Sequence, residues 1–190
     1  MHAERLQVLG IPGSLRRLSY NRGLLQAARE LAPDGMNIEI VDLAPIPVYN
    51  GDVEAEGDPP PVRTFKAQIA AADALLIATP EYNHLLSGVL KNAIDWATGD
   101  GRSENPLKGK PAAIMGASSG IAGTARAQLA LRQVLASTES YVLPPNPQIL
   151  VAGARDRFDS NGRLTDQPTR ERIRALLEAL RGWVEHFRPR

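Results

Sequence analysis

The 190-residue sequence contains no cysteine. Disulfides, thiolate metal sites, iron–sulfur clusters and cysteine nucleophiles are therefore excluded. Histidine is scarce too, with only His2, His84 and His186, so we do not expect a multi-histidine metal centre. Any redox chemistry must come from another side chain or from a bound cofactor.

An excess of charge is also missing. The 22 basic and 21 acidic side chains leave a formal net charge of +1. Proteins that bind nucleic acids or membrane surfaces usually carry a basic excess, so we expect neither partner. Apolar runs such as residues 74–78 and 112–115 are far shorter than the ~20 residues that span a bilayer. The first residues do not resemble a signal peptide, and we expect a cytoplasmic protein.

What the sequence does contain is an alternation of short apolar runs with longer amphipathic stretches. This pattern predicts an α/β fold in one domain over residues 1–190, with a five-stranded parallel sheet covered by helices on both faces. Residues 45–61 hold five prolines and are predicted to form a loop without regular structure. The predicted strands are residues 6–11, 38–41, 74–78, 112–115 and a proline-interrupted one within 142–151; the predicted helices are 21–31, 62–72, 88–97, 124–136 and 167–187.

Ligands of such folds bind beside the carboxyl ends of the strands. The first loop there, residues 10–21, opens a helix whose free N–H groups favour an anion. It is not a G-x-G-x-x-G loop, because Pro12 replaces the second glycine, and it is not a P-loop. Its donors either bind a terminal phosphate, as arginine can with two hydrogen bonds, or merely cap the helix and face solvent. The donors are Ser14, Arg16, Arg17, Ser19 and Asn21.

Two further loops follow the third and fourth predicted strands. Residues 79–84 either place Tyr82 and a backbone ledge beside a flat ligand or form a turn that covers a hydrophobic edge. Glu81 could bind substrate or face solvent, and His84 lacks the visible partner that a catalytic base needs. Residues 116–124 contain three glycines and two serines, which suit the polar edge of a heterocycle. Together the loops predict a small planar ligand with a phosphate tail.

At these residues the sequence resembles the NADPH-dependent FMN reductase family. The resemblance is carried by Gly13-Ser-Leu-Arg16 with Ser19-x-Asn21, and by Thr79-Pro-Glu-Tyr-Asn83 followed by Gly88-x-Leu-Lys-Asn-Ala-Ile-Asp-Trp96. Residues 118–133 resemble the family's third loop and its helix, and the likeness runs from about residue 6 to the final helix. It implies a flavodoxin-like three-layer sandwich that binds FMN and uses NADPH or NADH as co-substrate.

The resemblance also implies the cofactor-binding residues. Residues 84–87, His-Leu-Leu-Ser, and the pair Gly123-Thr124 depart from the usual pattern and bear on substrate preference rather than on flavin binding. No catalytic side chain and no metal is expected, because the flavin supplies the hydride chemistry. The implied residues are Ser14, Arg16, Ser19 and Asn21 at the phosphate, Leu15 in the same loop, Pro80, Glu81, Tyr82 and Asn83 along the ring and ribityl chain, and Ser118, Ser119 and Gly120 flanking the ring.

The resemblance implies a ping-pong oxidoreductase that reduces bound FMN with NAD(P)H and passes electrons to quinones, azo dyes, chromate, ferric chelates or free flavin. The alternatives are a flavodoxin-type electron carrier, which is usually strongly acidic, and a module that has lost its cofactor. Relatives are typically dimers or tetramers, so we expect a homodimer or homotetramer. Trp96 either contacts another subunit or belongs to the protein's own core.

Overall fold

The computed structural model describes residues 5–101 and 104–187. Its centre is a parallel sheet with the strand order β2-β1-β3-β4-β5, and β6 also pairs with β4. The strands are β1 (Leu6–Pro12), β2 (Met36–Ile40), β3 (Ala74–Ala78), β4 (Pro111–Ala117), β5 (Tyr141–Val142) and β6 (Ile149–Val151).

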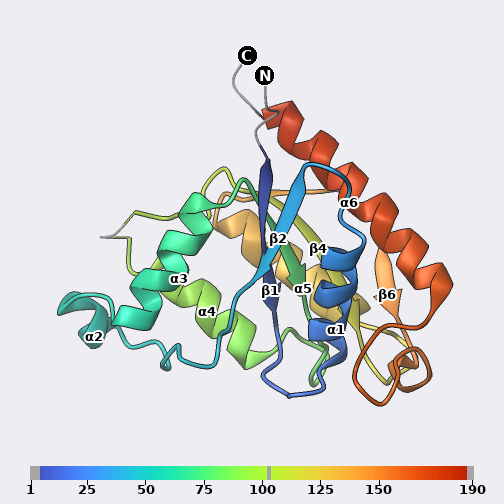
Figure 1. Ribbon diagram of the computed structural model, residues 1–190. Coiled ribbons are helices and arrows are strands. Elements are labelled where there is room, and N and C mark those ends of the chain that lie inside the picture. Colours follow the sequence, from blue (N-terminus) through green and yellow to red (C-terminus); the bar gives the residue numbers. More distant parts are fainter. Residues whose placement is uncertain (1–4, 102–103, 188–190) are drawn as a thin grey trace.

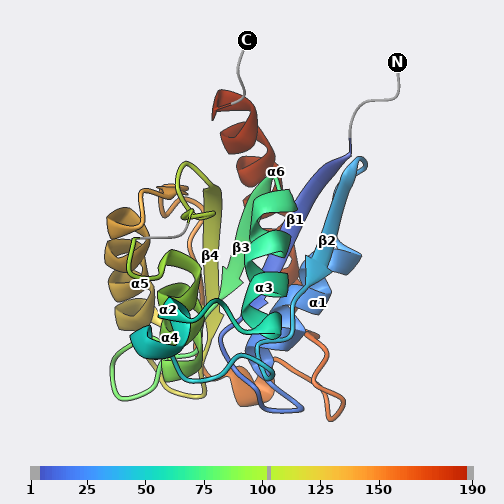
Figure 2. The ribbon, with the colours of Figure 1, turned by 90° about the vertical axis from the view of Figure 1, so that its left-hand side faces the viewer.

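Helices cover both faces of the sheet, which confirms the predicted three-layer α/β architecture. Helices α1 and α6 lie on one face, and α3, α4 and α5 lie on the other (Figures 1 and 2). The helices are α1 (Tyr20–Glu30), α2 (Gly51–Ala55), α3 (Pro60–Ala71), α4 (Gly88–Thr98), α5 (Ala125–Ser137) and α6 (Gln167–Phe187), with a short 3₁₀ turn at Ala154–Asp156.

Strand β3 shows why the sheet has two cores. Its side chains alternate, so Leu76 packs under α1 and α6 while Leu75 and Ile77 pack under the helices of the other face. All five side chains are at most 1% exposed. Burying each large one stabilises the fold by about 1.5–3 kcal/mol, and a strand buried on both faces reads as a continuous apolar run.

The predicted fifth strand is divided into two short pieces. β5 pairs with the start of β4 and β6 pairs with its end. Between them stand Pro144, Pro145 and Pro147, which have no N–H to donate to a neighbouring strand. The five strand positions of the sheet are thus filled as predicted, with one more strand because of the prolines.

The prediction for residues 45–61 was wrong in part, because this stretch contains α2 and the start of α3. Asn50 begins α2 by accepting a hydrogen bond from the N–H of Asp52. α3 starts with Pro60 and Pro61, and proline is tolerated in the first turn because the N–H groups there have no partner within the helix. Five prolines therefore indicate helix starts as well as loops.

Trp96 belongs to the protein's own core. Its side chain is fully buried, and its indole N–H donates to the Pro47 carbonyl oxygen at 2.8 Å. The ring meets the edge of Tyr49 with 5.0 Å between centroids. Of the two roles left open for Trp96, the structure supports the one within the protein's own core. There Trp96 anchors the loop before α2 on α4.

Candidate functional site

The carboxyl ends of β1, β3 and β4 meet at the lower edge of the sheet in Figure 1. The loops that follow these strands enclose a cleft of about 160 Å³. The cleft is lined by Ser14, Arg16, Ser19, Tyr20, Asn21, Pro80, Glu81, Tyr82, Ala117, Ser118 and Ser119. The three predicted loops therefore converge on one site.

The first loop supplies donors at the start of α1. Ser19 precedes the helix, and its hydroxyl oxygen accepts a hydrogen bond from Arg22 N, which leaves the hydroxyl proton available. Ser14 is 5% exposed and lies with its oxygen 3.5 Å from the Tyr82 hydroxyl. The Arg16 guanidinium lies 5.8 Å from the centre of the Tyr20 ring. Together with the first-turn N–H groups of α1, these donors give the arrangement that an anion would need.

Asn21 lines the cleft, but its amide is engaged elsewhere. Its Nδ2 donates to the Ala117 carbonyl at 3.0 Å, and its Oδ1 accepts from Ala117 N at 2.9 Å. This pair fixes the start of α1 to the end of β4. The phosphate role predicted for Asn21 stays a prediction, and the structure assigns its buried amide a role in holding two loops together.

The second loop is a tight hairpin. Tyr82 and Leu85 exchange both backbone hydrogen bonds, each 3.0 Å long. Asn83 and His84 between them have φ angles of 48° and 70°, as a two-residue type I′ turn requires. His84 lies exposed at the tip, outside the lining of the cleft. The hairpin therefore presents Tyr82, which is 48% exposed, to the site.

The start of α4 ties the first two loops together. The Ser87 hydroxyl donates to the Gly13 carbonyl oxygen and accepts from Leu90 N at 3.2 Å, so it begins α4 and holds the first loop at once. Gly13 also lets the second loop lie close against the first, since a Cβ there would lie 2.8 Å from Cδ of Pro80. Part of the departure from the family pattern at residues 84–87 thus has a structural role.

The structure shows what the side chain of Glu81 does, which the sequence left open between binding substrate and facing solvent. Its side chain is 6% exposed, and one carboxylate oxygen accepts from Arg126 N at 3.0 Å and Ala127 N at 3.2 Å. The other accepts from Arg126 Nε at 2.7 Å. Burial alone would raise the pKa of Glu81, but the hydrogen bonds from Ala127 and Arg126 outweigh it and hold this pKa below its usual value. Glu81 neither faces solvent nor offers a free carboxylate to a ligand.

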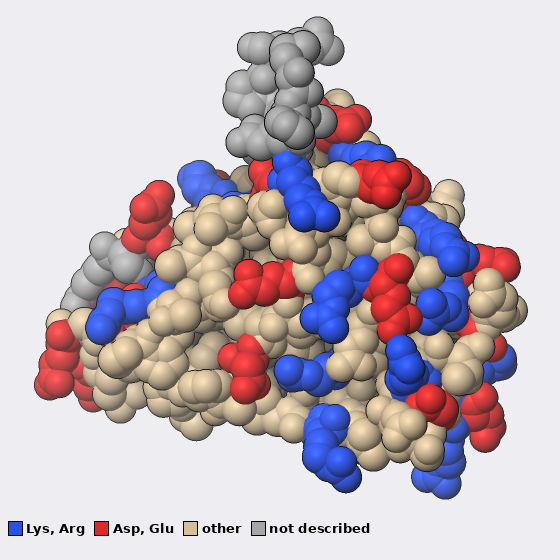
Figure 3. Space-filling view, in the orientation of Figure 1, with Lys and Arg blue, Asp and Glu red and all other residues tan. Residues whose placement is uncertain are grey.

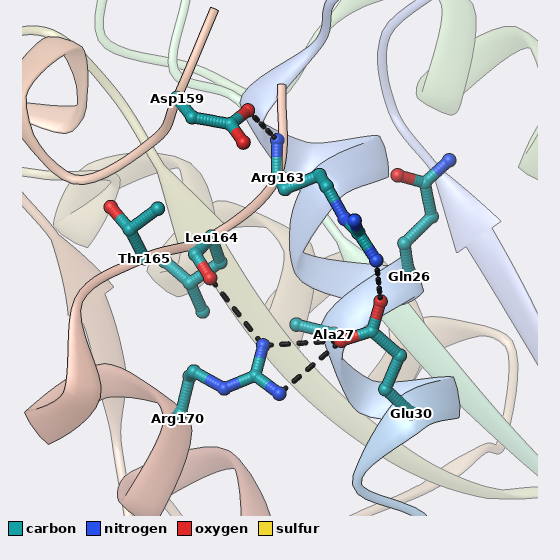
Figure 4. Close-up of a pocket in the computed structure, with 9 residues that line it drawn as sticks. Gln26, Ala27, Glu30, Asp159, Arg163, Leu164, Thr165 and Arg170 are labelled. Carbon is teal, nitrogen blue, oxygen red and sulfur yellow. Dashed lines mark hydrogen bonds and ion pairs between the residues drawn. The ribbon is translucent and has the colours of Figure 1, made fainter. Parts of the chain in front are cut away.

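A larger hollow of about 300 Å³ lies between α1 and residues 159–170 (Figure 4). Its charged side chains are already paired: Arg163 and Arg170 bind Glu30 at 3.4 and 3.2 Å, and Asp159 accepts from Arg163 N at 2.9 Å. This hollow is a polar seam within the protein. Within residues 5–101 and 104–187, no three histidine, aspartate or glutamate side chains are grouped to hold a metal ion, and His2 lies outside this range.

Residues 6–156 match the family model described as NADPH-dependent FMN reductase. The chain belongs to this family. It is 52% identical over 186 residues to an NAD(P)H-dependent FMN reductase of Pseudomonas aeruginosa, covering 98% of this chain and 99% of that one. It is 40% identical to a 2-hydroxy-1,4-benzoquinone reductase of a Burkholderia species, over 96% and 98% of the two chains. The solved structure of the flavoenzyme NAD(P)H:(acceptor) oxidoreductase of Paracoccus denitrificans superposes with a TM-score of 0.85 at 33% identity, covering 96% of this chain and 98% of that one.

Family membership makes the protein an oxidoreductase with FMN as its flavin and NAD(P)H as co-substrate, on a flavodoxin-like fold. The cleft fits this cofactor, because hydroxyls, a guanidinium and a helix N-terminus gather where a phosphate would lie. Membership supports the enzyme over the electron carrier.

The cleft differs from the predicted set of residues in a few places. Leu15, Asn83 and Gly120 lie outside its lining, and their roles stay predictions. Tyr20 and Ala117 line it without having been predicted. Tyr20 stands between Ser19 and Asn21 in the first motif, so its position was a usable signal. Ala117 has no functional group in its side chain, and only the end of β4 marks it.

Proposed function

We propose that the protein is a cytoplasmic enzyme that holds FMN by its phosphate at the start of α1, oxidises NAD(P)H and reduces small acceptors in a ping-pong cycle. The observation that carries this proposal is the convergence of Ser14, Arg16 and Ser19 on the N-terminus of α1, beside Tyr82. When bound, FMN would supply the redox chemistry, accepting a hydride from the nicotinamide and passing the electrons on to the acceptor.

The shape of the cleft supports a shared face for the two reactants. Its volume of about 160 Å³ is below the ~300–1,000 Å³ of pockets that enclose a drug-sized ligand. The enclosed part would therefore take the phosphate end of the cofactor, and the backbone of residues 80–82 and 118–119 would flank the ring. The ring's outer face would stay accessible, first to NAD(P)H and then to the acceptor.

Quinones are the acceptors that we favour, because the Burkholderia relative carries a benzoquinone reductase name. Charge agrees with this choice. Glu81 is neutralised by Arg126, and among the described residues Arg16 is the charged side chain of the cleft without an ion pair. Once Arg16 pairs with the FMN phosphate, the cleft has no unpaired positive charge to attract an anionic acceptor, and a neutral quinone is favoured. Azo dyes, chromate, ferric chelates and free flavin stay within the proposal as slower alternatives.

We further propose that the protein forms a homodimer or homotetramer through the surface around α5. Arg126 and Leu129 are one turn apart on its exposed side, and Arg126 is bound to the loop that carries Tyr82 and Leu85. The apolar side chains there are strongly exposed, at 72% for Leu129 and 56% for Leu85. A second copy of the chain that covered these side chains would remove their apolar surface from water.

An absorbance spectrum of the purified protein, followed by NADPH under anaerobic conditions, tests the proposed function. We expect a yellow protein that bleaches with NADPH and regains its colour when a benzoquinone is added. A protein that stays yellow with NADPH would indicate a carrier. A colourless protein that takes up no added FMN would refute flavin binding altogether.

A further inference from the structure

Helix α5 is capped by a residue from another loop. Thr124, which precedes α5, turns its hydroxyl towards Gln128, whose Nε2 donates to it at 3.1 Å. The first-turn N–H groups of Arg126 and Ala127 are bound instead by Glu81, which follows β3. A carboxylate at this position is stabilised by the helix dipole and by the Arg126 guanidinium. Glu81 therefore does the work of a helix cap at a sequence separation of 45 residues.

This contact joins two walls of the cleft. Pro80 and Tyr82, on either side of Glu81, line one wall, while Ser118 and Ser119, in the loop that leads into α5, line the other. Glu81 itself lines the cleft, but both of its carboxylate oxygens are engaged with α5, so neither is free to bind a ligand. The effect of Glu81 on the cleft is therefore to fix the positions of Pro80 and Tyr82.

We infer, on the basis of the proposed flavin function, that Glu81 is a positioning residue for the cofactor. Its carboxylate holds the hairpin of residues 80–85 against the start of α5 and so keeps the two walls at the spacing that a flat ring needs. It acts through the backbone of its own loop and through α5. Small displacements of such positioning elements change binding and rate strongly, because the productive geometry is narrow.

The chain contains a matched control for this inference. Asp166 precedes α6 and accepts from Thr169 N at 3.0 Å, and it also pairs with Arg157. Like Glu81 it is a nearly buried carboxylate at a helix start beside an arginine, with 10% of its side chain exposed. It lies outside the cleft lining. Loss of charge at Asp166 therefore measures the effect of a weakened helix start alone.

The experiment compares Glu81→Gln, Glu81→Ala and Asp166→Asn with the unmodified protein. Amide hydrogen exchange on the flavin-free proteins comes first. Glu81→Gln should speed exchange by roughly tenfold in residues 79–86 and in the first turn of α5, whereas Asp166→Asn should affect only the start of α6.

Titration of the three variants with FMN follows. We expect the dissociation constant to rise on the order of tenfold for Glu81→Gln, more for Glu81→Ala, and less than twofold for Asp166→Asn. At saturating FMN, the visible absorption band of the bound flavin should shift in the Glu81 variants only.

Two results would overturn the inference. One is faster exchange confined to α5 in the Glu81 variants, which would show that the hairpin does not depend on the carboxylate. The other is a Glu81→Gln variant that binds FMN with the affinity and absorption spectrum of the unmodified protein, while it loses as much stability as Asp166→Asn does. Glu81 would then be a helix cap only. If the unmodified protein bound no FMN, the proposed function would fail, while the exchange data would still decide whether Glu81 couples the two loops.

Discussion

Arg16 is the single residue whose replacement tests the phosphate site most directly, since its guanidinium lines the cleft beside Tyr20. Arg16→Ala should weaken FMN binding by about 1.5–3 kcal/mol, the usual scale for a hydrogen bond to a charged group. Arg17→Ala is the control, because Arg17 is an exposed neighbour outside the cleft lining and should leave the affinity unchanged. Fluorescence titration of the flavin-free proteins measures both. Equal affinities for the two variants would place the phosphate elsewhere.

At this scale, sequence predicts what depends on residue type and misses what depends on distant partners. Ser14, Arg16 and Ser19 are donors in a loop before a helix, and they line the cleft as that pattern indicates. Glu81 and Asn21 also line the cleft, and their cofactor roles stay predictions, but the polar atoms of their side chains bind groups 45 and 96 residues away. Nothing in the local sequence encodes these two contacts, because they arise only when β1, β3 and β4 assemble in one sheet.

At the scale of the helices and strands, Asp166 at the start of α6 should make the stability of the fold depend on pH. Hydrogen bonding from Thr169, assisted by Arg157 and opposed by burial, holds the pKa of Asp166 below its usual value. A lowered pKa stabilises the fold above the unfolded value near 4 and loses that contribution as the pH falls through the folded value. Asp166→Asn should therefore reduce the free energy of unfolding by about 0.3–1 kcal/mol at pH 7. The difference between the two proteins should be smaller at pH 2 than at pH 7.

Urea denaturation at both pH values measures the difference. Other carboxylates titrate equally in the two proteins and cancel. A difference that stayed constant down to pH 2 would show that Asp166 acts by shape rather than by charge.

Helices and strands whose buried residues repeat at a regular spacing were predicted, whereas those that depend on a few local hydrogen bonds were not. α6 repeats its buried leucines at helical spacing, and its predicted bounds of 167–187 match the structure. α2 has only five residues and depends on the Asn50 cap, so it has no period to detect. The split between β5 and β6 follows from prolines whose effect on pairing was visible in sequence, although the exact break was not.

For the molecule as a whole, the balance of charge bears on its partners. Figure 3 shows basic and acidic side chains interspersed over the face that carries α1 and α6, without a broad area of either sign. An electron carrier that docks on a protein partner usually needs such an area. Among the described residues, no helix is both long and apolar enough to cross a bilayer. On the face shown in Figure 3, no area of one sign is available for such docking.

Exposed apolar side chains on α5 and in the turn before it lead to the last prediction. Leu129 is 72% exposed on α5, beside the Arg126 that holds the Tyr82 hairpin, and Ile121 in the preceding turn is fully exposed. If a second copy covers this surface, Leu129→Glu should place an unpaired charge in the interface and shift the protein towards monomer. Val48→Glu is the control, because Val48 is also strongly exposed, at 85%. It lies on a different loop, beside Pro47, whose carbonyl is bound by Trp96 of α4. Light scattering across a range of protein concentrations should give a dimer or tetramer for the unmodified protein and for Val48→Glu, and a smaller species for Leu129→Glu. An unchanged mass for Leu129→Glu would move the interface away from α5.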